Sequence, residues 1–187
     1  PRAGLVHRLD RDTTGLMVVA RTLAAHKSLV DQLQRREVHR EYRALVNGHL
    51  VSGGRIEAPV GRHPVHRIRM AVVEGGRMSV THYQVLERFV GLTLLTVKLE
   101  TGRTHQIRVH MAHLHHPLVG DPLYGGRPRL TKGVDPRVSE AIKGFPRQAL
   151  HATALGLNHP ASAEMMYWQV PFPEDLLDLL GLLRQEH

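Results

Sequence analysis

The sequence predicts a single domain of the α+β class. Segments with strand propensity are separated by turn signals, and two pairs of them read as hairpins. Other segments carry apolar residues at helical spacing, and 187 residues suit one domain with a sizeable core. The chain has no cysteine, so it contains neither a disulfide nor a thiolate metal site. No apolar run approaches the roughly 20 residues of a membrane span. We therefore expect a cytoplasmic protein without a membrane partner, and we take a monomer as the default.

The N-terminal third is expected to contain two strands and a helix. Residues 16–20 predict a buried strand, and Thr22 is a suitable cap for a helix from residue 23 to about residue 35. The inward face of this helix is expected to carry Ala25, Leu29, Val30 and Leu33. Residues 41–46 predict a second strand, closed by a turn at Asn47-Gly48. Residues 52–78 are rich in glycine, proline and arginine, which indicates either solvated loops or an arm laid against phosphates.

The middle of the chain predicts a hairpin followed by a helix. Residues 80–89 and 92–99 have strand propensity on either side of Val90-Gly91. In residues 100–111 the spacing of apolar residues becomes helical, and Thr104 is a possible N-cap residue. The apolar stripe of this helix is expected to be Ile107, Met111 and Leu114. Arg108 flanks the stripe, so it either extends outward to solvent or turns inward to a buried carboxylate.

The C-terminal part predicts a second hairpin and a final helix. Residues 127–147 are polar and basic, and we expect them to be mobile or to fold on RNA. Residues 149–158 and 164–170 alternate as two paired strands. Pro173 is expected in the first turn of a helix that runs to residue 185. Its inward face should carry Leu176, Leu177, Leu180 and Leu183.

The charge of the chain indicates a polyanionic partner. The formal net charge is +8 and the sequence pI is about 10.6. A basic protein gathers phosphates and gains affinity from the counterions that they release, so nucleic acid is the leading candidate. The same charge would suit a non-catalytic RNA-binding or ribosome-assembly module, which is the alternative function.

The most unusual stretch is residues 7–16, in which Asp10 lies between two arginines and precedes Thr13-Thr14-Gly15. In isolation it reads as a turn whose aspartate bonds its own backbone. A metal site is disfavoured because no second pair of acids accompanies Asp10 and Asp12, and the histidines of residues 105–116 lack metal-ligand spacing. These histidines are expected at the surface or facing RNA. The sequence also lacks the Gly-x-Ser-x-Gly motif of a serine nucleophile. A lone carboxylate without a metal remains, and a facing guanidinium from Arg8 or Arg108 would keep it ionised.

Three separated motifs together resemble the A-type RNA pseudouridine synthases of the large ribosomal subunit. They are His7-Arg8-Leu9-Asp10 with Thr13-Thr14-Gly15, Tyr42 in Glu41-Tyr42-Arg43-Ala44, and Gly102-Arg103-Thr104-His105-Gln106-Ile107-Arg108-Val109-His110. The resemblance implies a mixed, mostly antiparallel sheet flanked by helices, with a central cleft. It also implies an isomerase that converts uridine to pseudouridine in structured RNA, above all large-subunit ribosomal RNA, without a cofactor.

The resemblance assigns roles to individual residues. Asp10 corresponds to the catalytic aspartate, Tyr42 to the tyrosine that stacks on the isomerising base, and Arg108 to the arginine that pairs with the aspartate. Substrate-binding residues are expected to be Arg8, which helps to displace the target nucleotide, Leu150, which packs on the base, and His7, Arg103, His105 and Gln106. Three routes stay open for Asp10, which are attack on the sugar, addition to the base and abstraction of a sugar proton.

The resemblance also bears on domain organisation. Family members have a strand before the first motif and often an S4-type RNA-binding domain ahead of it. Neither is present here, so we expect residues 1–187 to be most of a single, N-terminally truncated catalytic domain.

Overall fold

The computed structural model describes residues 4–126 and 134–186, which share one eight-stranded sheet. The sheet has the order β1-β7-β2-β6-β5-β3-β4, and β8 pairs with β7. All pairings are antiparallel except β1 with β7. The mixed, mostly antiparallel sheet expected from the sequence is therefore confirmed. The strands are β1 (Thr14–Gly15), β2 (His39–Asn47), β3 (Gly54–Arg62), β4 (Met70–Val72), β5 (Arg77–Phe89), β6 (Leu92–Leu99), β7 (Leu150–Asn158) and β8 (Met165–Gln169).

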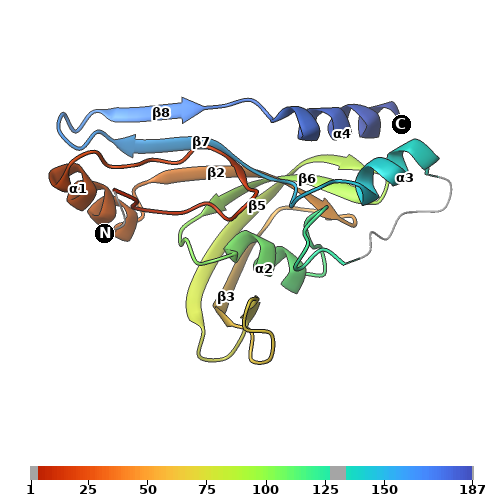
Figure 1. Cartoon of the computed structure of the whole chain (residues 1–187), viewed down its shortest axis with the longest axis horizontal. Coiled ribbons are helices and arrows are strands. Elements are labelled where there is room, and N and C mark those ends of the chain that lie inside the picture. Colours follow the sequence, from red (N-terminus) through yellow and green to blue (C-terminus); the bar gives the residue numbers. More distant parts are fainter. Residues whose placement is uncertain (1–3, 127–133, 187) are drawn as a thin grey trace.

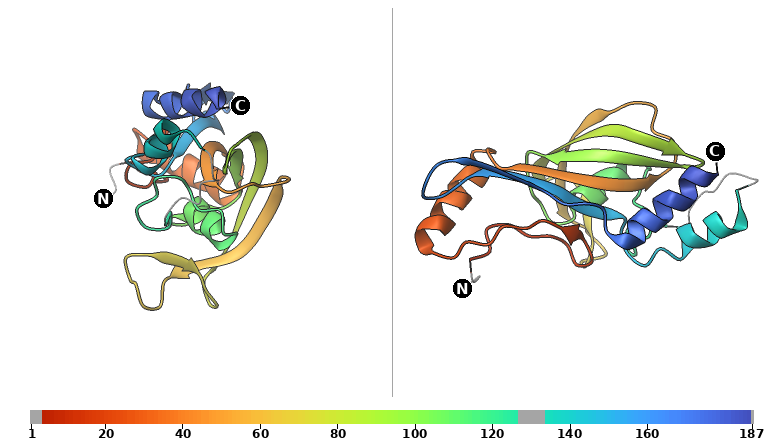
Figure 2. Two further views of the ribbon diagram at one scale, coloured as in Figure 1. Left: turned by 90° about the vertical axis from the view of Figure 1, so that its right-hand side faces the viewer. Right: turned by 90° about the horizontal axis from the view of Figure 1, so that it is seen from above.

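Helices flank this sheet at its two ends and on one face (Figure 1). They are α1 (Leu23–Gln34), α2 (Gln106–His113), α3 (Pro136–Lys143) and α4 (Glu174–Gln185). Figures 1 and 2 place α1 and the N-terminus at one end of the molecule and α3, α4 and the C-terminus at the other. No helix within the described residues is long and apolar enough to cross a membrane.

Residues 52–78 are not loop throughout, because they contain β3, β4 and the start of β5, and an arm laid against phosphates stays a prediction. β3 pairs with β5 and β4 pairs with β3, and this part of the sheet projects away from the rest (Figure 1 and the left view of Figure 2). Ile56, Ala58 and Val60 are buried at alternate positions of β3. This period-two pattern is typical of a strand with one covered face, but glycine, proline and arginine obscure it in the composition.

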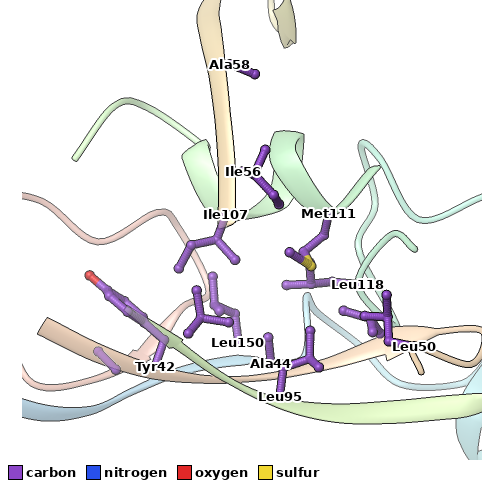
Figure 3. Packing of buried hydrophobic residues seen from close by; sticks show 13 residues of the cluster. Tyr42, Ala44, Leu50, Ile56, Ala58, Leu95, Ile107, Met111, Leu118 and Leu150 are labelled. Atoms are coloured by element: carbon purple, nitrogen blue, oxygen red, sulfur yellow. The ribbon is translucent and has the colours of Figure 1, made fainter. Parts of the chain in front are cut away.

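The main core lies between the sheet and α2 (Figure 3). The predicted stripe of α2 is confirmed, because Ile107 and Met111 are buried and Leu114 packs against the same cluster. The sheet contributes Tyr42, Ala44, Leu95 and Leu150, among others, to this cluster. Removing a large side chain from such a core costs about 2 to 5 kcal/mol. This packing fixes α2, and with it Arg108, against the sheet.

The buried strand predicted for residues 16–20 is wrong. Only Thr14 and Gly15 pair with β7, while Met17 and Val19 are 42% and 46% exposed. Val19 makes a single bridge to Leu5. The apolar run was mistaken for a strand because propensity does not say whether a partner edge continues beside it.

The basic segment before β7 contains a helix rather than only mobile chain. In α3, Asp135 caps the N-terminus and Val138 and Ile142 are buried in the second core with α4. The rest of the predicted mobile segment, residues 127–133, lies outside the described residues. The helical period of α3 is hard to recognise in the sequence, because the helix is only eight residues long and polar or charged side chains lie around its two buried residues, Val138 and Ile142.

The final helix is confirmed, but its inward face differs from the prediction. Leu179 is buried with Leu176, Leu180 and Leu183, whereas Leu177 is 46% exposed. Positions i, i+3, i+4 and i+7 form one stripe, which excludes Leu177. Pro173 is the N-cap residue rather than the first helical residue.

Candidate active site

A cleft of about 880 Å³ lies between the N-terminal loop, β2 and the segment that leads into α2. It is lined by eight of the residues that the sequence selects, which are His7, Arg8, Asp10, Tyr42, Arg103, His105, Gln106 and Leu150. The ninth, Arg108, reaches Asp10 from α2. Segments more than 90 residues apart in the chain therefore meet at one place, as the expected central cleft requires.

The loop that carries Asp10 is held by β7 and the residues before it. The backbone N–H of Thr13 donates to the carbonyl of Asp10 at 3.0 Å, which closes a turn. The Gln148 amide donates to the Thr13 hydroxyl at 3.0 Å. Gly15 has a φ of +110°, and a Cβ there would lie 2.1 Å from the carbonyl oxygen of Ala152, so only glycine fits. The Thr-Thr-Gly of the motif thus anchors the loop to the sheet edge.

Asp10 lies at one end of a buried cluster of two carboxylates and a guanidinium. Arg108 donates to both carboxylate oxygens of Asp121 at 2.7 and 2.8 Å, and a longer contact of 3.4 Å joins its Nη1 to Oδ2 of Asp10. The side chain of Arg108 is 4% exposed, that of Asp10 12% and that of Asp121 0%. The inward orientation of Arg108 is therefore the correct alternative of the two.

The charge of this cluster is well defined. Burial by itself lowers the pKa of Arg108, but the hydrogen bonds and charge of Asp121, followed by the charge of Asp10, outweigh burial and raise it. Arg108 is therefore a permanent cation. Asp121 accepts both short hydrogen bonds from Arg108, whereas Asp10, which lines the cleft, has only the longer contact with it.

Tyr42 forms the apolar side of the cleft. Its side chain is buried, and it packs in the same cluster as Ile107 and Leu150 (Figure 3). Burial raises the pKa of the Tyr42 hydroxyl, although the charge of Arg40 opposes that effect. The Tyr42 ring and Leu150 both line the cleft.

The Gly102 to Gln106 segment is held by its own side chains. The buried Gln106 amide accepts from the Thr101 hydroxyl and the Arg103 N–H, at 2.8 and 3.0 Å, and donates to the Val80 carbonyl at 3.0 Å. Gln106 lines the cleft, yet these bonds place its amide within the protein. The predicted Thr104 cap is wrong, because α2 begins at Gln106 and its N-cap residue is His105, with a φ of 57°.

His105 belongs to a network that the sequence did not predict. A hydrogen bond of 2.9 Å joins its Nδ1 to the hydroxyl of Tyr124, which accepts from the N–H of Met70 at 2.8 Å. The guanidinium carbon of Arg108 lies 5.1 Å from the centre of the Tyr124 ring. Tyr124 therefore connects β4, α2 and the cluster around Asp10.

The remaining histidines do not gather into a metal site. His110 was expected at the surface or facing RNA, but its side chain is buried in the core and contacts the Thr81 hydroxyl at 2.9 Å. Within the described residues there is no group of three or more histidines, aspartates or glutamates that could hold a metal ion.

His7 is fixed in one protonation state. Its Nε2 accepts from the backbone N–H of Val18 at 3.0 Å, so the proton of the neutral ring is on Nδ1. Burial, aided by the charge of Arg40, lowers the pKa of His7 to about 4. His7 is therefore a neutral hydrogen-bond donor at pH 7.

This state of His7 predicts acid sensitivity. The His7 imidazole takes up a proton near pH 6.5 in the unfolded chain but only near pH 4 in the folded chain. The free energy of unfolding therefore falls as the pH drops from about 6.5 to about 4. After discounting for partial exposure, the loss is on the order of 2 kcal/mol. Urea unfolding at several pH values would measure it. His7→Gln, which keeps an acceptor for Val18, should show a shallower dependence, and an unchanged slope would contradict this account.

Known proteins match the part of the chain that contains the three motifs. A family model described as RNA pseudouridylate synthase matches residues 1–113, which is more than half of the chain. The chain belongs to the RNA pseudouridylate synthase family. All three motifs of the family resemblance lie inside the matched range, and the family expected from them is confirmed.

Individual relatives agree with this family. The ribosomal large subunit pseudouridine synthase D of Pseudomonas aeruginosa is 60% identical over 186 residues, which cover 100% of this chain and 58% of that protein. The Escherichia coli K12 protein of the same name is 55% identical over 186 residues, covering 100% of this chain and 57% of its own length. The chain thus spans somewhat more than half of the length of these relatives.

Solved structures of the family share the fold. Human RNA pseudouridylate synthase domain containing 1 has a TM-score of 0.73 and 30% identity, covering 96% of this chain and 79% of its own. Human RNA pseudouridylate synthase domain containing 4 has a TM-score of 0.77, 24% identity and coverages of 96% and 75%. The pseudouridine synthase fold is therefore confirmed.

Four residues in or beside the site received no role from the sequence, namely Arg40, Asp121, Tyr124 and Gln148. Asp121 and Tyr124 follow α2 in a glycine-rich turn, and Gln148 precedes β7. None belongs to one of the three motifs. One signal was that a buried arginine needs a carboxylate partner, but the prediction paired Arg108 with Asp10.

Proposed function

We propose that this chain converts uridine to pseudouridine in structured RNA and that large-subunit ribosomal RNA is its substrate. The observation that carries the proposal is the buried Arg108, whose guanidinium lies 3.4 Å from the carboxylate of Asp10 at the cleft that Tyr42 also lines. The names of the two bacterial relatives support the substrate, and the net charge of +8 supports binding to RNA. We also propose that the chain is of the A type among these synthases, nearest to synthase D, and acts as a monomer in the cytoplasm.

The proposed roles follow the positions in the cleft. Asp10 acts on the reacting nucleotide, Tyr42 stacks on its base, and Arg108 keeps Asp10 ionised. The exposed Arg8 at the rim helps to displace the nucleotide, and Leu150 packs on the base. The bond from N1 of uracil to the sugar breaks and a bond from C5 forms. C5 loses its proton and N1 gains one, so the reaction balances without an oxidant, a reductant or a cofactor.

The proposal is tested by a nucleoside digest of large-subunit ribosomal RNA after incubation with the chain. We expect pseudouridine to increase with time, in step with tritium release from uridine labelled at C5. A non-catalytic RNA-binding or ribosome-assembly module would bind the same RNA in a salt-dependent manner and give no pseudouridine. RNA binding without any new pseudouridine would therefore overturn the proposed reaction.

A further inference from the structure

Arg40 is a buried cation in the wall of the cleft. It lies on β2 two residues before Tyr42, and therefore on the same face of the strand. The residue is 8% exposed, and it lines the cleft. Its guanidinium packs on Gly102, where a Cβ would lie 2.6 Å from Nη1. The glycine of the third motif thus makes room for Arg40.

The guanidinium of Arg40 lacks a counter-charge. Across residues 4–126 and 134–186, no carboxylate lies within ion-pair distance of it, and its Nε has no hydrogen-bond partner. The cleft is lined by two acids, Asp10 and Glu100. Asp10 faces Arg108, and Glu100 is bound by Arg36 and by His82, each at 2.6 Å. A buried cation without a partner is costly, so a ligand is the natural source of its counter-charge.

Two neighbouring side chains also present unused donors. His7 Nδ1 and Arg103 Nε are buried without a hydrogen-bond partner, and both residues line the same cleft as Arg40. Arg40 is close enough to His7 for its charge to lower the histidine pKa, and Arg103 follows Gly102, on which Arg40 packs. The neutral His7 carries its proton on Nδ1, so all three atoms are N–H donors.

We propose that Arg40, together with His7 and Arg103, binds one backbone phosphate of the RNA strand next to the nucleotide held on Tyr42. This inference rests on the proposed function, because it takes RNA as the ligand. A phosphate supplies a negative charge and several acceptor oxygens, which suit a planar guanidinium with two further donors. Two residues of extended strand separate the Cα atoms of Arg40 and Tyr42 by roughly 6 to 7 Å. The phosphate site therefore adjoins the stacked base.

The test compares Arg40→Met with the wild-type chain in binding to a large-subunit ribosomal RNA transcript at several NaCl concentrations. We expect affinity to fall about tenfold or more, as for loss of a charged hydrogen bond. The slope of log affinity against log salt should fall by about 0.7 to 0.9, the value for one phosphate contact. The melting temperature should stay the same or rise, because Met removes an uncompensated charge. The matched control is Arg137→Met, which removes an exposed arginine paired with Asp135 and should change affinity less than twofold.

Each outcome decides the inference. If Arg40→Met leaves both the RNA affinity and its salt dependence unchanged, the phosphate site is overturned. A weaker affinity with an unchanged salt dependence would also overturn it, because a contact to a base releases no counterion. A chain that unfolds when Arg40 is replaced would also overturn it, since the cation would then be needed by the fold. If the slope changes as expected but the wild-type chain makes no pseudouridine, the phosphate site stands and the proposed function fails.

Discussion

Asp10→Asn is expected to abolish pseudouridine formation while RNA binding survives. Asparagine has nearly the same shape, and its side-chain oxygen can still accept from Arg108, so the loop should keep its place. The amide, however, can act neither as a nucleophile nor as a base, and removal of such a group costs on the order of a thousandfold in rate or more. Tritium release from RNA labelled at C5 of uridine measures the loss, and a filter-binding titration measures the affinity.

Asp12→Asn is the matched control for this variant. Asp12 lies two residues further along the same loop, its side chain is 53% exposed, and it does not line the cleft. Its φ of 66° suits asparagine, so the change should leave both rate and affinity near those of the wild-type chain. Tritium release by Asp10→Asn at the wild-type rate would contradict the role of Asp10.

Arg108→Met is expected to reduce both stability and turnover. The change leaves Asp121 fully buried and without its cation, and breaking a buried ion pair from one side costs about 3 to 5 kcal/mol. It also removes the cation that faces Asp10 at 3.4 Å. Urea unfolding gives the stability, and tritium release at a temperature where the variant stays folded gives the turnover.

The double variant Arg108→Met with Asp121→Asn separates these two effects. Asparagine removes the unpaired charge and can still accept from the N–H groups of Leu123 and Tyr124, which Asp121 receives at 2.9 and 3.0 Å. We expect much of the stability to return while turnover stays low, because Asp10 still lacks its cation. Recovery of turnover together with stability would show that Arg108 serves only the fold.

The sequence predicted those elements whose pattern is local. The hairpin of β5 and β6, the hairpin of β7 and β8, and the Thr22 cap of α1 all follow from turn residues and side-chain period within a few positions. Several errors concern local details, such as the cap of α2 and the inward face of α4, and one concerns a feature that depends on distant neighbours. Residues 16–20 have strand propensity, but only Thr14 and Gly15, just before this segment, pair with β7, and β8 pairs with β7 from Ala154 onward.

In the site, too, residues within recognisable local motifs could be predicted, whereas residues that act through distant partners could not. The motif residues around Asp10, Tyr42 and Arg108 could be selected from the sequence because each sits in a recognisable pattern. Asp121 could not, because a buried guanidinium makes a partner necessary without saying which of the acids in the chain provides it. Arg40 was missed for a related reason, since a basic residue in a basic chain attracts notice only when its burial is known.

The central claim is that Asp10 in this cleft isomerises uridine in large-subunit ribosomal RNA. The most direct measurement is a map of pseudouridines in that RNA before and after incubation with the wild-type chain and, in parallel, with Asp10→Asn. The account predicts new pseudouridines at specific positions with the wild-type chain and none with the variant. The same map with and without protein, or the same new positions with both proteins, would contradict it.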